Sequence, residues 1–227
     1  IPKLILEKNL FGLDIDNRAS QLTTFALMMK GRADDRRLFD RGIKPNLIAL
    51  QDSTDLDVVG LADQIGLSNY GLQLNDLTEL KRLFEHATTF GSLIQVPEGL
   101  AEKLPVLKKM SEATGRSLLV SEDFKRLKPL LQQAEILAKQ YDVVVANPPY
   151  MGSKFHVPVL KKFLKVHYNG YEKDVFSAFI DRDLAFSNKH GRQGFMSPFV
   201  WMFISSHEHL RTRLINKETI TSLVQLE

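Results

Sequence analysis

The fold of this chain is decided by one stretch, Tyr141-Asp142-Val143-Val144-Val145-Ala146-Asn147-Pro148-Pro149-Tyr150. Its first half is apolar and holds three successive valines, a pattern typical of a strand that is buried on both faces in a parallel sheet. The two prolines lack an N–H group and fix φ at about −65°, so the strand must end there in a stiff loop. Functional groups of parallel α/β sheets gather at the carboxyl ends of the strands. The stretch therefore predicts an α/β fold with a functional loop over residues 147–150.

The loop offers three groups that suit a planar substrate with an exocyclic amino group. The Asn147 amide can donate and accept hydrogen bonds, Pro148 supplies a carbonyl oxygen, and Tyr150 supplies an aromatic face. Such an amino group is a poor nucleophile because its lone pair is delocalised into the ring. Two oxygens that accept its N–H bonds favour a more pyramidal nitrogen and aim the lone pair at an electrophile. The alternative is a strand followed by an ordinary proline turn, which the strand context and Tyr150 disfavour.

The loop resembles the catalytic signature of amino-group methyltransferases that use S-adenosylmethionine, above all the N6-adenine DNA methyltransferases. The resemblance implies catalytic roles for the four loop residues Asn147, Pro148, Pro149 and Tyr150. In this family the bound substrate is an adenine flipped out of duplex DNA. The same loop also occurs in enzymes that methylate protein glutamine or RNA, so the loop alone does not distinguish these substrates.

A second match is Leu10-Phe11-Gly12-Leu13-Asp14-Ile15-Asp16-Asn17-Arg18-Ala19. The resemblance implies that Asp14 binds the ribose hydroxyls of the cofactor and that Ile15 packs against its adenine. The local pattern agrees, because an Asp at a strand end followed by a helix, here predicted over 18–30, forms the ribose-binding corner of nucleotide folds. Asp16 is better interpreted as the N-cap of that helix than as a ligand.

A third match is Pro45-Asn46-Leu47-Ile48-Ala49-Leu50-Gln51-Asp52-Ser53, another apolar strand that is closed by an acid. By resemblance, Asp52 accepts a hydrogen bond from the adenine amino group of the cofactor. A role as helix N-cap for the following turn is the alternative. The stretch Phe90–Ile94 competes for the same place in the family pattern, but it offers no acid.

The wider resemblance is to the adenine-specific methyltransferases of BREX phage-defence systems, known as PglX, and to fused restriction-modification enzymes. It covers most of the chain and implies membership of a phage-defence or restriction-modification system. The stretches that carry it are Leu6–Arg18, Thr89–Gln95, Tyr141–Lys154, Tyr171–Asp181 and Gly194–Glu227. No G-x-G loop for the methionine part of the cofactor occurs in the sequence. We therefore expect an internal fragment of a catalytic domain that binds S-adenosylmethionine weakly or not at all in isolation.

The fold that we expect is a partial doubly wound, Rossmann-like methyltransferase sheet with a helical insertion between its third and fourth strands. Residues 1–52 form the first part of the core with the cofactor edge, 53–140 the insertion, and 141–227 the second part with the catalytic loop. The insertion is expected because parallel strands normally need only a short crossover, and this segment is several times longer. Its apolar residues recur at helical spacing on two expected helices, one with Leu77, Leu80, Leu83 and Phe84 and another with Leu127, Leu130, Leu131, Ala134 and Leu137. After the loop the pattern predicts helices over 159–167, 174–188 and 205–216, and strands over 194–198 and 220–226.

A run of basic residues follows the loop: Lys154, Lys161, Lys162 and Lys165. Interleaved with aromatic residues, these lysines can follow the phosphate backbone of double-stranded DNA. The alternative is an amphipathic helix whose lysines only face water. The two interpretations are compatible, because lysines that face solvent are free to meet DNA.

Composition limits the remaining classes. The chain of 227 residues has 44% hydrophobic residues, no Cys and a net charge of +3, and no apolar run reaches the length of a membrane span. His207 and His209 are two apart on an expected helix and so point apart, which argues against a metal site. We expect a cytoplasmic protein whose partners are DNA and, in some cases, other defence-system subunits. From a different class, the chain could instead be a DNA-binding or partner-binding module that is inactive in isolation.

Overall fold

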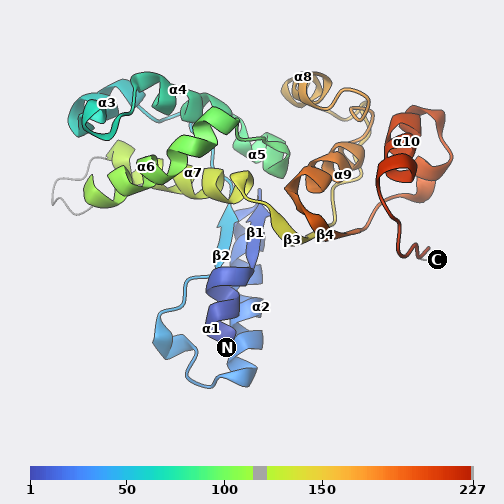
Figure 1. The fold of residues 1–227 in the computed structure, drawn as a ribbon, viewed down its shortest axis with the longest axis horizontal. Coiled ribbons are helices and arrows are strands. Elements are labelled where there is room, and N and C mark those ends of the chain that lie inside the picture. The colour runs from blue at the N-terminus through green and yellow to red at the C-terminus, as the bar shows by residue number, and fades with distance from the viewer. Residues whose placement is uncertain (115–121, 226–227) are drawn as a thin grey trace. The chain divides into compact units, whose positions relative to one another are not determined.

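The structure, a computed structural model, describes residues 1–114 and 122–225. The chain divides into two compact units, Ile1–Ala138 and Lys139–Glu227. Each unit combines helices with one two-stranded sheet, and in both sheets the strands are parallel. The elements are labelled in Figure 1. The expected mixture of helices and parallel strands is therefore confirmed at this level.

The sheet of the first unit brings two strand ends to one edge. Strand β1 (Phe11–Asp14) pairs with β2 (Asn46–Ala49), and Asp14 lies beside Ala49. The backbone N–H of Leu50 donates to the Asp14 carbonyl at 2.8 Å, which continues the pairing past the strand end. Because the strands are parallel, the residues that follow each of them emerge at the same edge of the sheet.

Helix α2 (Asn17–Asp34) connects these strands and starts where the sequence predicts. The Asp16 carboxylate accepts from the Arg18 N–H at 2.8 Å, so its predicted role as N-cap is confirmed. The apolar side chains Leu22, Phe25 and Met29 are nevertheless exposed on this helix. The helix contacts the sheet through its other side, where Ser20 is buried.

The rest of the first unit is helical over its described residues. Leu77 and Leu80 are buried on one helix and Phe84 directly after its end. The apolar face of the last helix, from Leu127 to Leu137, is buried as its spacing predicts. Both helices contact α6 (Glu98–Thr114), and together these helices form the core of the unit. The helices are α1 (Pro2–Leu4), α3 (Val58–Ile65), α4 (Leu74–Leu83), α5 (Ala87–Phe90), α6 (Glu98–Thr114) and α7 (Glu122–Ala138).

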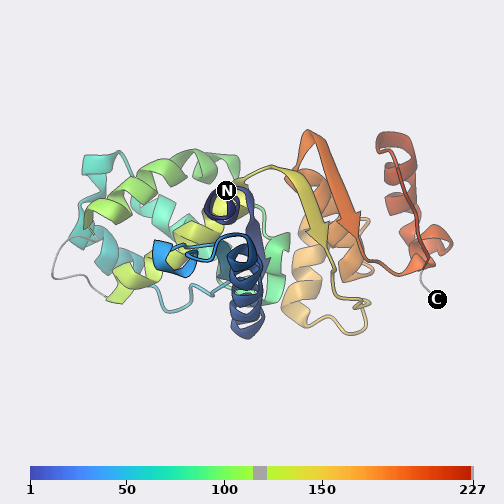
Figure 2. The same ribbon diagram turned by 90° about the horizontal axis from the view of Figure 1, so that it is seen from below.

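In the second unit, β3 (Tyr141–Ala146) pairs with β4 (Ser187–Phe195). Figure 2 shows the two strands side by side, with helix α9 (Val175–Phe186) along the sheet. The other helices are α8 (Pro158–His167) and α10 (Glu208–Lys217). All three lie within two or three residues of the predicted helices.

The prediction that β3 is covered on both faces is wrong for this chain. Val144 is half-buried, but Val143 is 62% exposed and Val145 is 78% exposed. Alternating exposure of this kind arises because α9 packs against one face of the sheet and leaves the other face open. A run of valines shows that a strand is suited to burial on both faces, but burial of the second face also needs another element that packs against it.

The two strands predicted near the end of the chain also need correction. Of the strand expected over 194–198, only residues 194–195 are strand: they end the longer β4, which begins at Ser187 directly after α9, and residues 196–198 lie beyond it. No strand forms over residues 220–225, which are irregular and exposed. Position 226 of that prediction lies outside the described residues. A strand needs a partner for its backbone groups, and residues 220–225 have found none in the described structure.

The longest helix that the structure describes is α2, with 18 residues, and it carries charged side chains near both of its ends. None of the helices formed by residues 1–114 and 122–225 combines the length and the apolar character that a membrane crossing requires.

Candidate functional site

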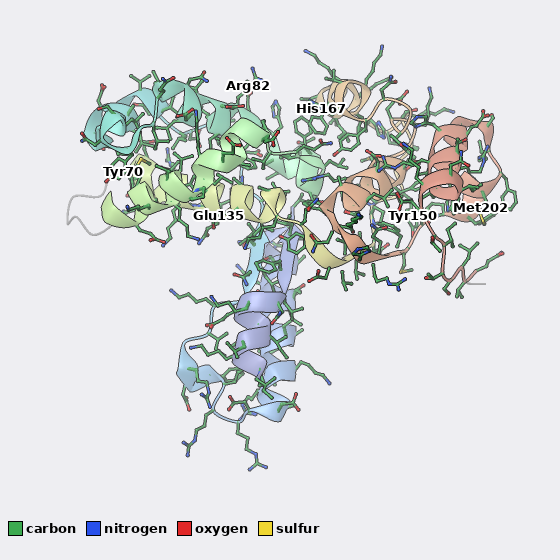
Figure 3. All side chains as sticks on the ribbon, viewed as in Figure 1. Tyr70, Arg82, Glu135, Tyr150, His167 and Met202 are labelled. Atoms are coloured by element: carbon green, nitrogen blue, oxygen red, sulfur yellow. The ribbon has the colours of Figure 1, made fainter. Side chains whose placement is uncertain are left out.

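The loop Asn147–Tyr150 follows β3 directly, as the prolines predict. Pro148 is buried, whereas the Asn147 side chain is exposed and Tyr150 is 55% exposed. Upstream of the loop, the Ala146 carbonyl accepts from the Met196 N–H at 3.1 Å, which fixes the last residue of the strand against β4. Tyr150 is labelled among the side chains of this unit in Figure 3. The buried Pro148 thus gives the loop a stiff support, while the polar Asn147 amide and the aromatic Tyr150 ring both remain accessible.

The segment after the loop is bound to the start of α9. The Met151 N–H donates to Asp174 Oδ1 at 3.1 Å, and Asp174 is also the N-cap of α9. We did not identify Asp174 as a functional residue from the sequence. The available signal was its position as the acid before Val175, which marks the helix start but not its contact with a residue 23 positions earlier.

In the first unit, Asp14 and Ile15 stand at the end of β1. The Asp14 carboxylate is half-buried, and its Oδ1 accepts from the Asp16 N–H at 2.8 Å in a local turn. No described residue donates to Oδ2. Ile15 is 55% exposed, which is unusual for a large apolar side chain next to a strand. The pair thus offers a carboxylate oxygen and an apolar surface side by side.

Asp52 lies three residues beyond the end of β2 and binds a different part of the chain. Its Oδ1 accepts from the Thr88 N–H at 2.8 Å, and its Oδ2 accepts from the Thr88 hydroxyl at 2.9 Å. Asp52 therefore caps the short helix α5, whereas the turn that follows it leads to α3, which is capped by Asp57. Asp52 is exposed, and a carboxylate has about four lone-pair positions, so it can accept a further hydrogen bond.

The backbone next to Asp52 is held by a buried glutamine on α7. Gln133 Oε1 accepts from the Gln51 N–H, and Gln133 Nε2 donates to the Gln51 carbonyl, both at 3.0 Å. The Gln133 side chain is fully buried among the apolar residues of α7. A glutamine within the apolar face of a predicted helix was a visible signal that sequence analysis missed. Such an amide is expected to have a partner, because burial of an unpaired polar group is costly.

The parallel pairing of β1 with β2 therefore brings Asp14, Ile15 and the segment around Asp52 to one edge of the first sheet. The four loop residues Asn147–Tyr150 and the four lysines belong to the second unit. Unit 1 also contains an open hollow of about 540 Å³ beside α2, β2 and α7. Amide and hydroxyl side chains make up much of its lining, and it does not include Asp14, Ile15 or Asp52.

The four lysines predicted to contact DNA are all exposed, and no ion pair within the described residues involves them. Helix α8 buries Leu160 and Leu164 and carries Lys161, Lys162 and Lys165 on its exposed side. Lys154 lies in the turn before the helix, next to Phe155, which is 77% exposed. The amphipathic interpretation of this segment is therefore confirmed, and its positive charges face solvent.

The buried charges of the second unit lie at the other end of β3 from the loop. Burial raises the pKa of Asp183 to about 7 and that of Tyr141 to about 12. The Arg182 guanidinium carbon lies 3.6 Å from the centre of the Phe186 ring. Tyr141 is the first residue of β3, whereas Asn147 follows its last residue. These groups belong to the packing of α9 against the sheet and do not take part in the candidate site.

His207 belongs to the support of α9 and makes a hydrogen bond within the core. Its Nδ1 lies 2.9 Å from the Ser177 hydroxyl, and burial lowers its pKa. This contact gives a structural role to His207, one of the two histidines on either side of Glu208 in the sequence.

A family model described as Eco57I restriction-modification methylase matches residues 8–227. The adenine-specific methyltransferase BrxX of Escherichia coli O9:H4 (strain HS) is 38% identical over an alignment of 252 residues that covers 100% of this chain and 20% of the relative. The adenine-specific methyltransferase PglX of Lacticaseibacillus casei (strain Zhang) is 34% identical over 92% of this chain and 18% of the relative.

A more distant relative is the type II restriction enzyme and methyltransferase RM.Eco57I of Escherichia coli. It is 24% identical over 61% of this chain and 15% of the relative. The chain thus spans at most 20% of the length of each of these curated relatives.

Proposed function

Because the chain belongs to the Eco57I restriction-modification methylase family, we propose that it carries catalytic residues of a DNA adenine-N6 methyltransferase in a restriction-modification or BREX-type defence system. One observation carries the proposal most strongly. The exposed Asn147 amide and Tyr150 ring stand on a stiff double-proline loop directly after a parallel strand. This is the arrangement that presentation of an exocyclic amino group requires.

In the proposed reaction an adenine leaves the stack of duplex DNA, at a cost of a few kcal/mol. Tyr150 stacks on the flipped base, a contact worth about 1–3 kcal/mol. The Asn147 side-chain oxygen and the Pro148 carbonyl accept the two N–H bonds of the amino group and direct its lone pair. Pro149 keeps the loop rigid. The nitrogen would form a bond to the methyl carbon as the bond from that carbon to the sulfonium sulfur breaks, which leaves the cofactor as a neutral thioether, and the nitrogen would then lose one of its protons to solvent.

The residues at the edge of the first sheet fit S-adenosylmethionine. Asp14 Oδ2 is available to a ribose hydroxyl, exposed Ile15 to the face of an adenine, and Asp52 to an amino group. When bound, this cofactor supplies an electrophilic methyl group on a sulfonium. Its polar and aromatic parts match a carboxylate and an apolar surface that the protein presents together.

We further propose that the two sheets belong to one Rossmann-like methyltransferase sheet. Residues 1–52 and 141–227 would form its two parts, and the helices within 53–140 an insertion between its third and fourth strands. The parallel pairing within each sheet and the long helical stretch between β2 and β3 support this arrangement. Lys154, Lys161, Lys162 and Lys165 would contact DNA phosphates, and the protein would act in the cytoplasm, where other defence subunits are possible partners.

The test offers labelled S-adenosylmethionine to the intact protein that contains this chain, with duplex DNA, RNA and a glutamine-containing peptide as separate acceptors. We expect label in the DNA, recovered after digestion as N6-methyladenine. Label only in RNA or only in the peptide would overturn the choice of substrate. Binding of DNA without transfer to any acceptor would favour the binding-module alternative.

A further inference from the structure

The two prolines of the loop leave it with few backbone groups that could hold it in place. Neither Pro148 nor Pro149 has a backbone N–H, so neither can donate a hydrogen bond that would fix the loop. Yet Asn147 and Tyr150 must be placed accurately, because a displacement of about 1 Å at a reacting centre can cost about 100-fold in rate. The loop must therefore be held at its two ends. Ala146 provides the upstream end through its bond to Met196.

At the downstream end, the backbone N–H and the carbonyl of Met151 are both hydrogen-bonded to other residues of the second unit. The Met151 N–H donates to Asp174 Oδ1 at 3.1 Å. The Met151 carbonyl accepts from the Val175 N–H at 3.1 Å and lies 2.8 Å from His156 Nε2. Because a carbonyl can only accept, His156 Nε2 must carry the proton in this contact. Three hydrogen bonds thus converge on the residue directly after Tyr150.

The neighbouring backbone repeats the attachment. Gly152 and Asp174 form an antiparallel bridge, and the Ser153 N–H donates to the Lys173 carbonyl at 2.9 Å. The segment after the loop therefore runs beside the segment before α9 in a short two-stranded pairing. Asp174 stands at its centre, since its neighbours Lys173 and Val175 make the backbone hydrogen bonds and its own side chain binds the Met151 N–H.

The helix on which Asp174 stands is firmly seated. Val175, Phe176, Ser177 and Ala178 are all at most 3% exposed. The same Oδ1 of Asp174 accepts from the Phe176 N–H at 3.3 Å, so one carboxylate oxygen caps the helix and binds Met151. A loop tied to this oxygen is tied to the core of the unit.

On these grounds, and resting on the proposed function, we propose that Asp174 is the positioning residue of the catalytic loop. Its carboxylate fixes Met151 and thereby the geometry of Asn147 and Tyr150, although it does not touch the substrate. His156 assists from the other side of Met151. One residue, Asp174, thus both caps α9 and anchors the catalytic loop.

The test uses the intact protein and three variants. Asp174→Ala removes the acceptor, Asp174→Asn keeps an oxygen at the same place, and Asp57→Ala is the matched control. Asp57 caps α3 through the N–H groups of Val59 and Gly60, at 3.1 Å each, in the other unit. Both alanine variants lose a helix N-cap and should lose stability to a similar extent. Only the first also loses the bond to Met151.

We expect Asp174→Ala to lower kcat by about 100-fold with the KM values for DNA and cofactor nearly unchanged. Asp174→Asn should restore most of kcat, and Asp57→Ala should leave it unchanged. An equal fall in kcat for both alanine variants, or no fall in either, would overturn the proposal.

Hydrogen exchange of the backbone amides supplies a readout that does not depend on activity. In Asp174→Ala the amides of residues 151–155 should exchange faster, and in Asp57→Ala they should not. If the wild-type protein transfers no methyl group but this difference appears, the proposed function fails and the anchoring role stands. If the wild-type protein methylates DNA and neither kcat nor exchange responds to Asp174→Ala, the anchoring role fails alone.

Discussion

The end of β2 and the end of β3 each lead into candidate site residues, but different parts of the chain hold them. After β2, the segment with Asp52 is bound by Thr88 and Gln133, at sequence separations of 36 and 82 for the bonds concerned. After β3, the loop with Asn147 is followed at once by Met151, which is bound by Asp174 at a separation of 23. The end of β2 depends on a helical region that is distant in sequence, and the end of β3 depends on the start of α9, the helix that leads into its partner strand β4.

The difference teaches where substitutions should act. Changes in α5 or α7 should reach the cofactor edge through Asp52 and Gln51, whereas changes at the start of α9 should reach the methyl acceptor through Met151. The two steps of the proposed reaction, cofactor binding and presentation of the amino group, should therefore be separable by mutation.

The largest effect is expected from Asn147→Ala. The variant loses the side-chain oxygen that accepts from the adenine amino group, and removal of one such preorganised partner costs about 100- to 1000-fold or more in rate. Methyl transfer should be abolished or nearly so, while calorimetry of the intact protein shows unchanged cofactor affinity. Loss of cofactor affinity in this variant would contradict the comparison, because it would show that the loop after β3 also affects cofactor binding.

Gln133→Leu tests the segment that follows the end of β2. It leaves the N–H and the carbonyl of Gln51 without their partners, at a cost of about 1–2 kcal/mol in unfolding free energy. We expect cofactor affinity to weaken by up to about tenfold, since 1.4 kcal/mol corresponds to about that factor. Methyl transfer at saturating cofactor should remain close to the wild-type rate.

The control is Gln132→Leu, the same change at the neighbouring exposed position of α7. It should leave both cofactor affinity and thermal stability near their wild-type values. A rate defect at saturating cofactor in Gln133→Leu, absent from the control, would contradict the separation of the two strand ends.

A double change, Lys161→Glu with Lys162→Glu, sharpens the account of the second unit. Both side chains are exposed on α8. If both meet phosphates, DNA binding should weaken, and the slope of log affinity against log salt should become shallower by about 2. The matched control is Lys30→Glu with Lys44→Glu, which changes net charge equally in the first unit. Equal loss of DNA affinity in both double variants would indicate a general charge effect without local contact.

The smallest effect on transfer is expected from Asp183→Asn, which tests the stability of α9 alone. In the folded protein Asp183 has a pKa of about 7, raised from 3.8 by burial. Between these values the folded state keeps a proton that the unfolded state has lost, so stability from this group falls as pH rises from about 4 to 7. Asp183→Asn should remove that fall, by a few kcal/mol at most, since one pKa unit is about 1.4 kcal/mol.

Urea unfolding of wild type and Asp183→Asn at a series of pH values measures this difference. The gap in unfolding free energy should widen in favour of the variant up to about pH 7 and then stay constant. Parallel stability curves at every pH would show that Asp183 is ionised in the folded protein. The rate of methyl transfer per folded molecule should not change.

Helices were predictable from the sequence because their signals are local. The apolar spacing from Leu127 to Leu137 and the cap Asp16 each act within a few residues, and the structure has those helices close to the predicted positions. Strands were less predictable, since a strand forms only where a partner exists. This is why residues 220–225 are irregular although their apolar pattern suits a strand.

The candidate site divides in the same way. The exposed loop Asn147–Tyr150 and the turn at Asp14 are local features, and the sequence places them at the ends of β3 and β1 as the structure has them. Asp174 and Gln133 escaped prediction because each acts on backbone groups that are distant in sequence. The sequence can signal that such a side chain needs a partner or begins a helix, but only the fold reveals which distant backbone groups it binds.

The central claim, that the Asn147 loop methylates adenine N6 in DNA, is tested most directly in cells. Genomic DNA is sequenced for N6-methyladenine from cells with the intact gene, with the gene deleted, and with the deletion complemented by the Asn147→Ala gene. The account predicts a methylated sequence motif that is present only with the intact gene. The same motif methylated in the Asn147→Ala cells, or no difference between intact and deleted cells, would contradict it.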